Sequence, residues 1–434
     1  MNFRLTGILI LSILLFSSCS KEKDILNEQA QKYLSDYNEF VDSLTTYHPA
    51  LYEFTSQDSF DKKVAQLRSE IDNKTTEKDI VWKLSEVIAL VGCGHTSLGF
   101  FNQERDLLKP EEYFPLLTRF INGKLYVIDN LTNKSIIQKG DEITEINDQP
   151  IANIINTVYS HIPAQAHIRT AKIKMFNNYN TSYIPYALNF PEVYTIKTSS
   201  DKTVTLNSLN QNPPYAPFFS QKHPCQNDFC LTEINQETTL LTLRNVAYYG
   251  DQTKTYTDFL DSSFEEIKDT GYQNLIIDVR GNLGGPGESS IYLLRHTLQE
   301  PFNYFAKNGS DFGRTELQQP FENNYEGNII FVMNGEGYST VGHLASIYKD
   351  KNRVTFIGET LGSNQFCSAN QKQFELTNTG FRYKVARNNF FTDVKEKNRS
   401  APIEPDINIE QSIDDFLSDN DVVLKKAIAL TGKQ

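Results

Sequence analysis

The chain has 434 residues, which at roughly 100–200 residues per domain predicts two or three domains. Hydrophobic residues make up 39% and aromatic residues 12%, enough apolar material for folded cores and too much for a disordered protein. The formal net charge of −12 argues against a nucleic-acid partner.

The amino end, residues 1–23, is typical of a targeting segment followed by a tether. Arg4 precedes a short apolar stretch, Leu5 to Phe16, which is too short to span a membrane. Two serines then precede Cys19, and this resembles the lipobox of bacterial lipoproteins, whose cysteine becomes the lipidated first residue. We therefore expect an exported lipoprotein without a transmembrane helix, in the outer membrane and facing the periplasm or the cell surface. An ordinary signal peptide with an incidental cysteine is the alternative.

Residues 24–103 are predicted to be helical. Phe40 and Leu44 fall at helical spacing in the first helix, as do Val64 and Leu67 in the second. A third helix is expected over residues 80–90, just before Gly94-His95-Thr96.

Residues 104–206 follow a pattern of short strands. Residues 124–128 alternate in polarity, and Gly140 is followed by an acidic residue, a second alternating strand and an Asn-Asp turn. This arrangement resembles the core hairpin of PDZ domains, and a helix over residues 151–162 and a strand at 203–206 follow it. Another small β-rich module is the alternative.

From Thr238 onward, predicted strands alternate with predicted helices, which indicates α/β architecture. The expected strands are 240–243, 275–278, 328–333 and 354–357, and the expected helices are 256–267, 289–298, 341–348 and a closing helix over 413–430.

The strand at 275–278 leads into a glycine turn. Such a turn at the carboxyl end of a buried strand presents backbone N–H groups where α/β sheets bind ligands, and it can serve as an oxyanion hole. A plain connection between strand and helix is the alternative. The charged pair in this stretch, Asp278 and Arg280, is expected to brace the turn and to take no part in chemistry.

A second apolar strand runs into Asn334 and a short loop that places Ser339 at a helix start. Serine is a favoured helix N-cap, so capping is one interpretation of Ser339. The other is a nucleophile beside the backbone N–H groups of the helix, which favour negative charge. The spacing between Gly337 and Gly342 differs from the G-x-S-x-G elbow, which argues against an α/β-hydrolase.

Three stretches in this order resemble the catalytic domain of tail-specific, or C-terminal-processing, serine peptidases, and their tricorn-like branch fits best. They are residues 275–285, 334–342 and 356–362, and Ile403-Glu-Pro-Asp406 also matches. The resemblance implies a multidomain α/β protein, with a ClpP/crotonase-like peptidase core over residues 207–434, the PDZ-like domain and the helical region before it. It also implies that the PDZ-like domain presents peptide substrates by adding them as an edge strand.

The resemblance implies a role for each site residue. Ser339 matches the nucleophile, and His95 matches the histidine that serves as general base in the tricorn-like branch. The lysine that another branch uses is absent, since Ser363 and Asn364 occupy its region.

The remaining roles are an acidic residue that orients the imidazole and the donors of the oxyanion hole. Glu396 is the candidate for the acid, with Asp393 as a second choice. Gly284 or Gly285, together with Thr340, are implied as oxyanion donors.

Four cysteines remain beyond Cys19, and in an exported protein an even count suggests disulfides. Cys225 and Cys230 could close a small loop, and Cys93 could pair with Cys367 if their neighbouring motifs meet. Free buried thiols are the alternative. No metal site is expected, because no histidine pattern accompanies the cysteines.

The sequence therefore predicts an exported, lipid-anchored serine endopeptidase that needs no cofactor and acts on peptides or proteins. A peptide-binding lipoprotein with a degenerate site and an esterase are the two rivals. The oligomeric state and the substrate are left open.

Overall fold

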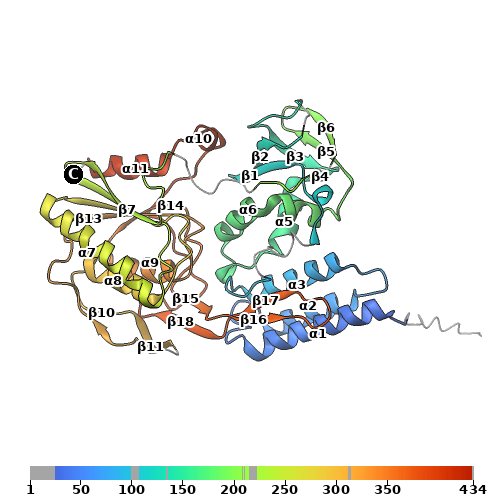
Figure 1. The fold of residues 1–434 in the computed structure, drawn as a ribbon, viewed down its shortest axis with the longest axis horizontal. Helices are drawn as coiled ribbons and strands as arrows, with labels where there is room; N and C mark the ends of the chain where they lie inside the picture. Colours follow the sequence, from blue (N-terminus) through green and yellow to red (C-terminus); the bar gives the residue numbers. More distant parts are fainter. Residues whose placement is uncertain are drawn as a thin grey trace, which may run out of the picture.

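The computed structural model describes residues 25–98, 107–132, 135–207, 209, 211–214, 222–310 and 314–432. The predicted lipidation residue Cys19 and the rest of the targeting segment lie outside these ranges. Within them, no helix combines the length and apolar character needed to cross a membrane. Figure 1 shows an amino-terminal helical region, a small module built on a sheet, and a larger α/β part.

The helical region consists of three helices, as predicted. They are α1 (Glu28–Tyr47), α2 (Gln57–Ser69) and α3 (Glu77–Val91). Their apolar faces meet in one core that includes Phe40 and Leu84. A distant hairpin joins this core through Tyr383, and Figure 1 shows it against the helices. The hairpin is formed by β16 (Lys372–Glu375) and β17 (Arg382–Val385).

The small module is a sheet with the strand order β1-β2-β3-β5-β6, in which β4 pairs with β3. The strands are β1 (Leu116–Ile121), β2 (Lys124–Asn130), β3 (Glu142–Ile146), β4 (Gln149–Pro150), β5 (Val193–Thr198) and β6 (Thr203–Asn207). Two helices accompany it, α5 (Ile151–Tyr159) and α6 (Arg169–Ala187). Helix α6 was not predicted, because it is buried on several sides and shows no single apolar stripe.

Helix α6 closes the free edge of β1. The Asn177 side chain accepts from the Phe120 N–H at 2.6 Å and donates to the Phe120 carbonyl at 3.1 Å. Asn180 accepts from the Thr118 N–H at 3.4 Å and donates to the Thr118 carbonyl at 3.0 Å. Both asparagines are 2% exposed. The expectation that substrate adds as a strand is therefore wrong at β1, since α6 already occupies its hydrogen-bonding groups.

The α/β part is built on a six-stranded sheet with the order β19-β14-β13-β9-β8-β7. The strands are β7 (Phe229–Asn235), β8 (Thr238–Leu243), β9 (Asn274–Asp278), β13 (Asn328–Met333), β14 (Thr355–Gly358) and β19 (Ile407–Asn408). All neighbouring pairs are parallel except β7 with β8. Four of the strands were predicted, and β9 is buried along its whole length, as its apolar run indicated.

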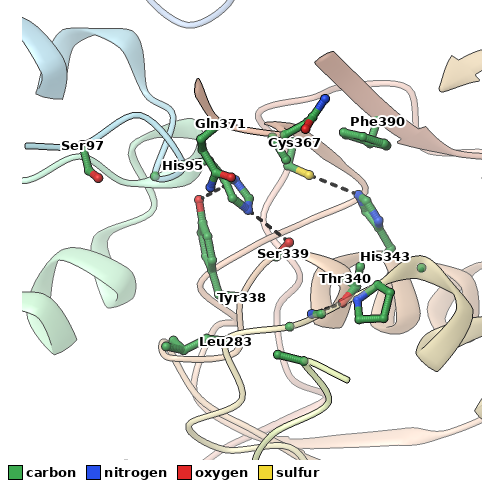
Figure 2. A pocket seen from close by; sticks show the side chains of 18 of the residues that line it. His95, Ser97, Leu283, Tyr338, Ser339, Thr340, His343, Cys367, Gln371 and Phe390 are labelled. Atoms are coloured by element: carbon green, nitrogen blue, oxygen red, sulfur yellow. Dashed lines mark hydrogen bonds between the residues drawn. The ribbon is translucent and has the colours of Figure 1, made fainter. Parts of the chain in front are cut away.

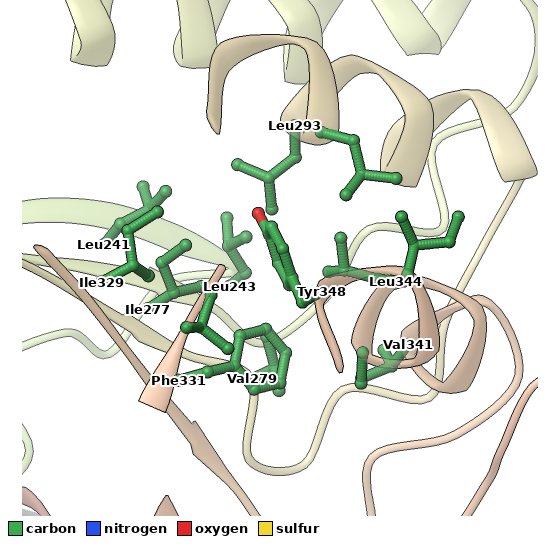
Figure 3. Close-up of a cluster of buried hydrophobic side chains, with 14 of the residues drawn as sticks. Leu241, Leu243, Ile277, Val279, Leu293, Ile329, Phe331, Val341, Leu344 and Tyr348 are labelled. Carbon is green, nitrogen blue, oxygen red and sulfur yellow. The ribbon is translucent and has the colours of Figure 1, made fainter. Parts of the chain in front are cut away.

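Helices cover both faces of this sheet. On one face lie α7 (Thr253–Thr270), α8 (Gly287–Thr297) and α9 (Thr340–Lys351). Figure 3 shows side chains such as Leu293 and Tyr348 packed against strand residues such as Ile277 and Phe331. On the other face lies α11 (Val422–Thr431).

The predicted closing helix is two helices. The first is α10 (Ile413–Leu417), and α11 begins at Val422 after a polar turn. Within that turn Asp419 takes a left-handed conformation with a φ of 55°, and Asp421 caps α11 by accepting from the Leu424 N–H. The apolar spacing carried no sign of this break.

Short strands complete the structure near the site. A three-stranded sheet has the order β11-β18-β15, and β10 pairs with β12. Their bounds are β10 (Phe302–Asn303), β11 (Phe305–Ser310), β12 (Leu317–Gln318), β15 (Phe366–Ala369) and β18 (Asn388–Thr392), and the 3-10 turns are Pro110–Glu112, Gln165–His167 and Gly250–Gln252.

Candidate active site

Ser339 lies between β13 and α9 in a backbone conformation that non-glycine residues rarely adopt. Its φ is 57° and its ψ is −121°. The Ser339 side chain makes no capping hydrogen bond, so the capping interpretation is wrong. A strained serine between a strand and a helix is typical of a nucleophile whose hydroxyl must be presented outward.

His95 reaches Ser339 across 244 residues of sequence. The distance from His95 Nε2 to Ser339 Oγ is 3.1 Å, and Figure 2 shows the two side chains facing each other. The segment that carries His95 is tied to β17, where Ser97 and Lys384 exchange two backbone hydrogen bonds of 3.0 and 2.8 Å. The predicted nucleophile and base are therefore brought together.

The other ring nitrogen of His95 faces a tyrosine that the sequence reading missed. The Tyr338 hydroxyl lies 3.1 Å from His95 Nδ1. Gly94 makes room for it, because a Cβ at that position would lie 2.3 Å from the hydroxyl oxygen. Tyr338 directly precedes Ser339 in the sequence, but no sequence rule predicts that a tyrosine at this position contacts a histidine.

Burial sets the protonation of both groups. It lowers the pKa of His95 to about 4, and the Ser368 carbonyl beside the ring acts in the opposite direction. Burial also raises the pKa of Tyr338 well above its ordinary value. At neutral pH both side chains are uncharged, and the imidazole can accept a proton.

The predicted acidic residue does not reach the imidazole. Glu396 is exposed, and its carboxylate accepts from the Asn398 N–H at 2.7 Å. Asp393 is also exposed and accepts from the Asn303 side chain at 3.1 Å. Among the described residues no carboxylate is bonded to the His95 ring. The assignment of Glu396 is corrected accordingly.

The glycine turn lies directly against Ser339. Gly284 has a φ of 86°, and a Cβ there would lie 2.8 Å from the Ser339 Cβ. Its N–H donates to the Asn282 side chain at 2.8 Å, so this hydrogen is already engaged in the present conformation, and the predicted oxyanion role stays a prediction. The Gly285 N–H donates to the Thr340 hydroxyl at 2.9 Å. Thr340 is the first residue of α9, and its own N–H has no acceptor within the helix.

Asp278 and Arg280 brace the turn, as expected. The Arg280 guanidinium donates to Asp278 at 2.6 Å and to Asp421 at 2.7 Å. His223 lies 3.2 Å from Asp278. Desolvation of the buried Asp278 is outweighed by Arg280 and His223, so its pKa lies below its usual range.

One of the two expected cysteine pairs forms a disulfide. Cys225 and Cys230 are bonded, as predicted. Cys93 and Cys367 are free and buried, so the pairing predicted for them is wrong. Their segments do meet, but the Cys93 thiol donates to the Ser368 carbonyl at 3.4 Å, and the Cys367 sulfur lies 3.5 Å from His343 Nε2.

A cavity of about 950 Å³ is lined by His95, Tyr338, Ser339, Thr340 and the glycine turn. Its walls come from the His95 segment, α6, the glycine turn, α8, α9 and the β11-β18-β15 sheet. The site thus offers a hydroxyl, a neutral base and helix-terminal N–H groups beside a space large enough for a peptide segment.

The fold and the site define a serine-type peptidase. Residues 241–409, which include Ser339 and the glycine turn, match the model of peptidase family S41. Among solved structures, a point mutant of CPAF superposes with a TM-score of 0.62 at 12% identity, over 90% of this chain and 95% of that chain. Mature CPAF gives 0.59 at 12% identity over 90% and 95%. Mature CPAF complexed with lactacystin gives 0.59 at 11% identity over 92% and 97%. None of the curated proteins matches the chain.

Proposed function

We propose that the protein is a serine endopeptidase in which Ser339 and His95 carry out acyl transfer. The observation that carries this proposal is the 3.1 Å contact between His95 Nε2 and the hydroxyl of a strained Ser339. In the proposed reaction, Ser339 Oγ attacks the peptide carbonyl while Nε2 takes the hydroxyl proton. The same nitrogen then gives the proton to the leaving amine, and water hydrolyses the acyl-enzyme.

Tyr338 takes the orienting position that an acid holds in the familiar triad. As a base, His95 needs its free lone pair on Nε2, so its proton must sit on Nδ1. The Ser368 carbonyl can only accept a hydrogen bond, and the Tyr338 oxygen also accepts when Nδ1 is protonated. The Ser368 carbonyl favours a protonated ring nitrogen, and the Tyr338 hydroxyl is compatible with the productive tautomer; neither contact adds a negative charge.

The oxyanion is proposed to bind the Thr340 N–H first. The Gly285 N–H becomes a second donor when the Thr340 hydroxyl turns away from it, which needs only a side-chain rotation. Removal of one such donor typically costs about 100- to 1,000-fold in kcat.

A fluorophosphonate probe tests this assignment. We expect it to label Ser339 in the folded wild type, to leave Ser339→Ala unlabelled and to react far more slowly with His95→Ala. Equal labelling of wild type and His95→Ala would overturn the proposal.

A peptide-binding protein without turnover is the second candidate function. It is favoured by the Gly284 and Gly285 amides, whose N–H groups already have acceptors. Peptide affinity without cleavage would support it.

We further propose export and lipid anchoring at Cys19, in the outer membrane. The targeting pattern of the amino end supports this, and so does the Cys225–Cys230 disulfide, because disulfides persist in oxidising compartments. Metabolic labelling with a palmitate analogue should mark the wild type and leave Cys19→Ala unmarked. Equal labelling of both proteins would contradict the anchor.

A further inference from the structure

One part of the catalytic cavity is lined by Phe305, His343, Cys367 and Phe390, and we call it the apolar lobe. These residues come from β11, α9, β15 and β18. The rings of Phe305 and His343 lie 5.7 Å apart edge to face, and those of Phe305 and Phe390 also lie 5.7 Å apart. The lobe is therefore walled by aromatic rings and a thiol that four separate elements hold in place.

The walls of the lobe are uncharged at neutral pH. Burial lowers the pKa of His343 to about 3 and raises the pKa of the Cys367 thiol. Glu288 and Arg314 also line the cavity, where Arg314 and Phe305 both approach Gly287, and the two charges pair with each other at 2.7 Å. A charged substrate side chain would lose its hydration here without gaining an unpaired partner.

The position of His95 shows which side of the substrate would meet the lobe. The general base must later protonate the leaving amine, so the leaving half of the peptide lies on the His95 side of Ser339. Figure 2 shows His95 on one side of Ser339, His343 and Phe390 on the other, and Cys367 between the two sides. The acyl half of the peptide therefore lies toward the lobe.

We propose that the apolar lobe is the S1 pocket and that it accepts a large apolar side chain, such as Phe, Leu or Met, from the residue whose carbonyl is attacked. This inference rests on the proposed function. A hydrophobic pocket typically discriminates roughly 10- to 200-fold for one methylene of fit. Selectivity for Phe or Leu over Ala should reach at least that range, and Glu and Lys should rank below Ala.

The test uses peptidyl diphenyl phosphonates that differ only in the side chain at this position, Phe, Leu, Ala, Glu or Lys. The rate of covalent labelling of Ser339 is followed by mass spectrometry on the full chain. We expect Phe and Leu to label at least tenfold faster than Ala. Equal rates for all five probes, or fastest labelling by Glu or Lys, would overturn the pocket assignment.

A pair of neighbouring phenylalanines provides matched variants. Phe390→Ala should widen the lobe and reduce the preference for Phe over Ala by tenfold or more. Phe391→Ala, on the opposite face of the same strand, should keep the preference of the wild type. An unchanged preference in Phe390→Ala would count against the lobe. If the fluorophosphonate labels Ser339 but the five peptidyl phosphonates react at equal rates, the pocket assignment alone is refuted. If neither type of probe labels Ser339, the proposed function is refuted.

Discussion

Replacing Ser339 by glycine should stabilise the protein while it removes the proposed nucleophile. Ser339 has a φ of 57° and a ψ of −121°, where a Cβ is strained. Such a residue costs about 1–3 kcal/mol. Glycine reaches this conformation freely but loses about 0.5–1 kcal/mol through its larger entropy in the unfolded chain. Compared with Ser339→Ala, which keeps the strain, Ser339→Gly should gain about 0.5–2 kcal/mol.

The assay is urea unfolding of Ser339→Gly and Ser339→Ala, since both variants lose the hydrogen bond to His95 equally. Ser262 in α7 provides the control, because it is exposed within an ordinary helix. There glycine should be less stable than alanine by about 1 kcal/mol. If glycine at position 339 is no more stable than alanine, the backbone strain assigned to Ser339 is refuted.

Three further predictions concern His95, Tyr338 and Asn180. Because the protonated imidazole cannot act as a base, kcat/KM of a peptide substrate should fall as the pH drops through about 4; a midpoint near the ordinary histidine value of about 6.5 would contradict this. Tyr338→Phe should lower kcat by roughly 10- to 100-fold with little change in KM and should move the acidic limb of the pH profile; an unchanged profile would remove Tyr338 from the mechanism. Asn180→Ala leaves the buried Thr118 N–H and carbonyl without these partners. The free energy of unfolding, measured by urea titration, should therefore fall by about 2–5 kcal/mol. A loss below about 0.5 kcal/mol would show that water or a rearranged α6 replaces the asparagine.

The sequence predicted the elements that have a clear period or a clear boundary. The buried run at 275–278 became β9, and the helix predicted over residues 80–90 became α3, which begins three residues earlier, at Glu77, after its cap Thr76. Helix α6 was not predicted, because it is buried on several faces and therefore has no amphipathic pattern. The break between α10 and α11 was not predicted, because it depends on the local turn geometry around Asp419.

Of the candidate site, too, the sequence could predict some residues and not others. Ser339 and His95 were found only because their surroundings resemble a known family, since no local rule links residues so far apart in sequence. Glu396 was predicted from the acidic residue of the family, but the groups beside the His95 ring are the Tyr338 hydroxyl and the Ser368 carbonyl. Neutral groups of this kind leave no charge signature in a sequence. The pairing of Cys93 with Cys367 was predicted because each neighbours a site motif. The two segments do meet, but proximity of two motifs in the fold does not determine where their thiols point.

The asparagines of α6 also bear on how the protein behaves in a crowded compartment. An exposed strand edge is a template on which a second chain can add and start aggregation. By offering amide groups that imitate a neighbouring backbone, Asn177 and Asn180 remove this template from β1. Because these side chains occupy the edge of β1, the module cannot bind a second polypeptide there as an added strand. Selection among polypeptides then falls to the cleft itself, where the bond is cut.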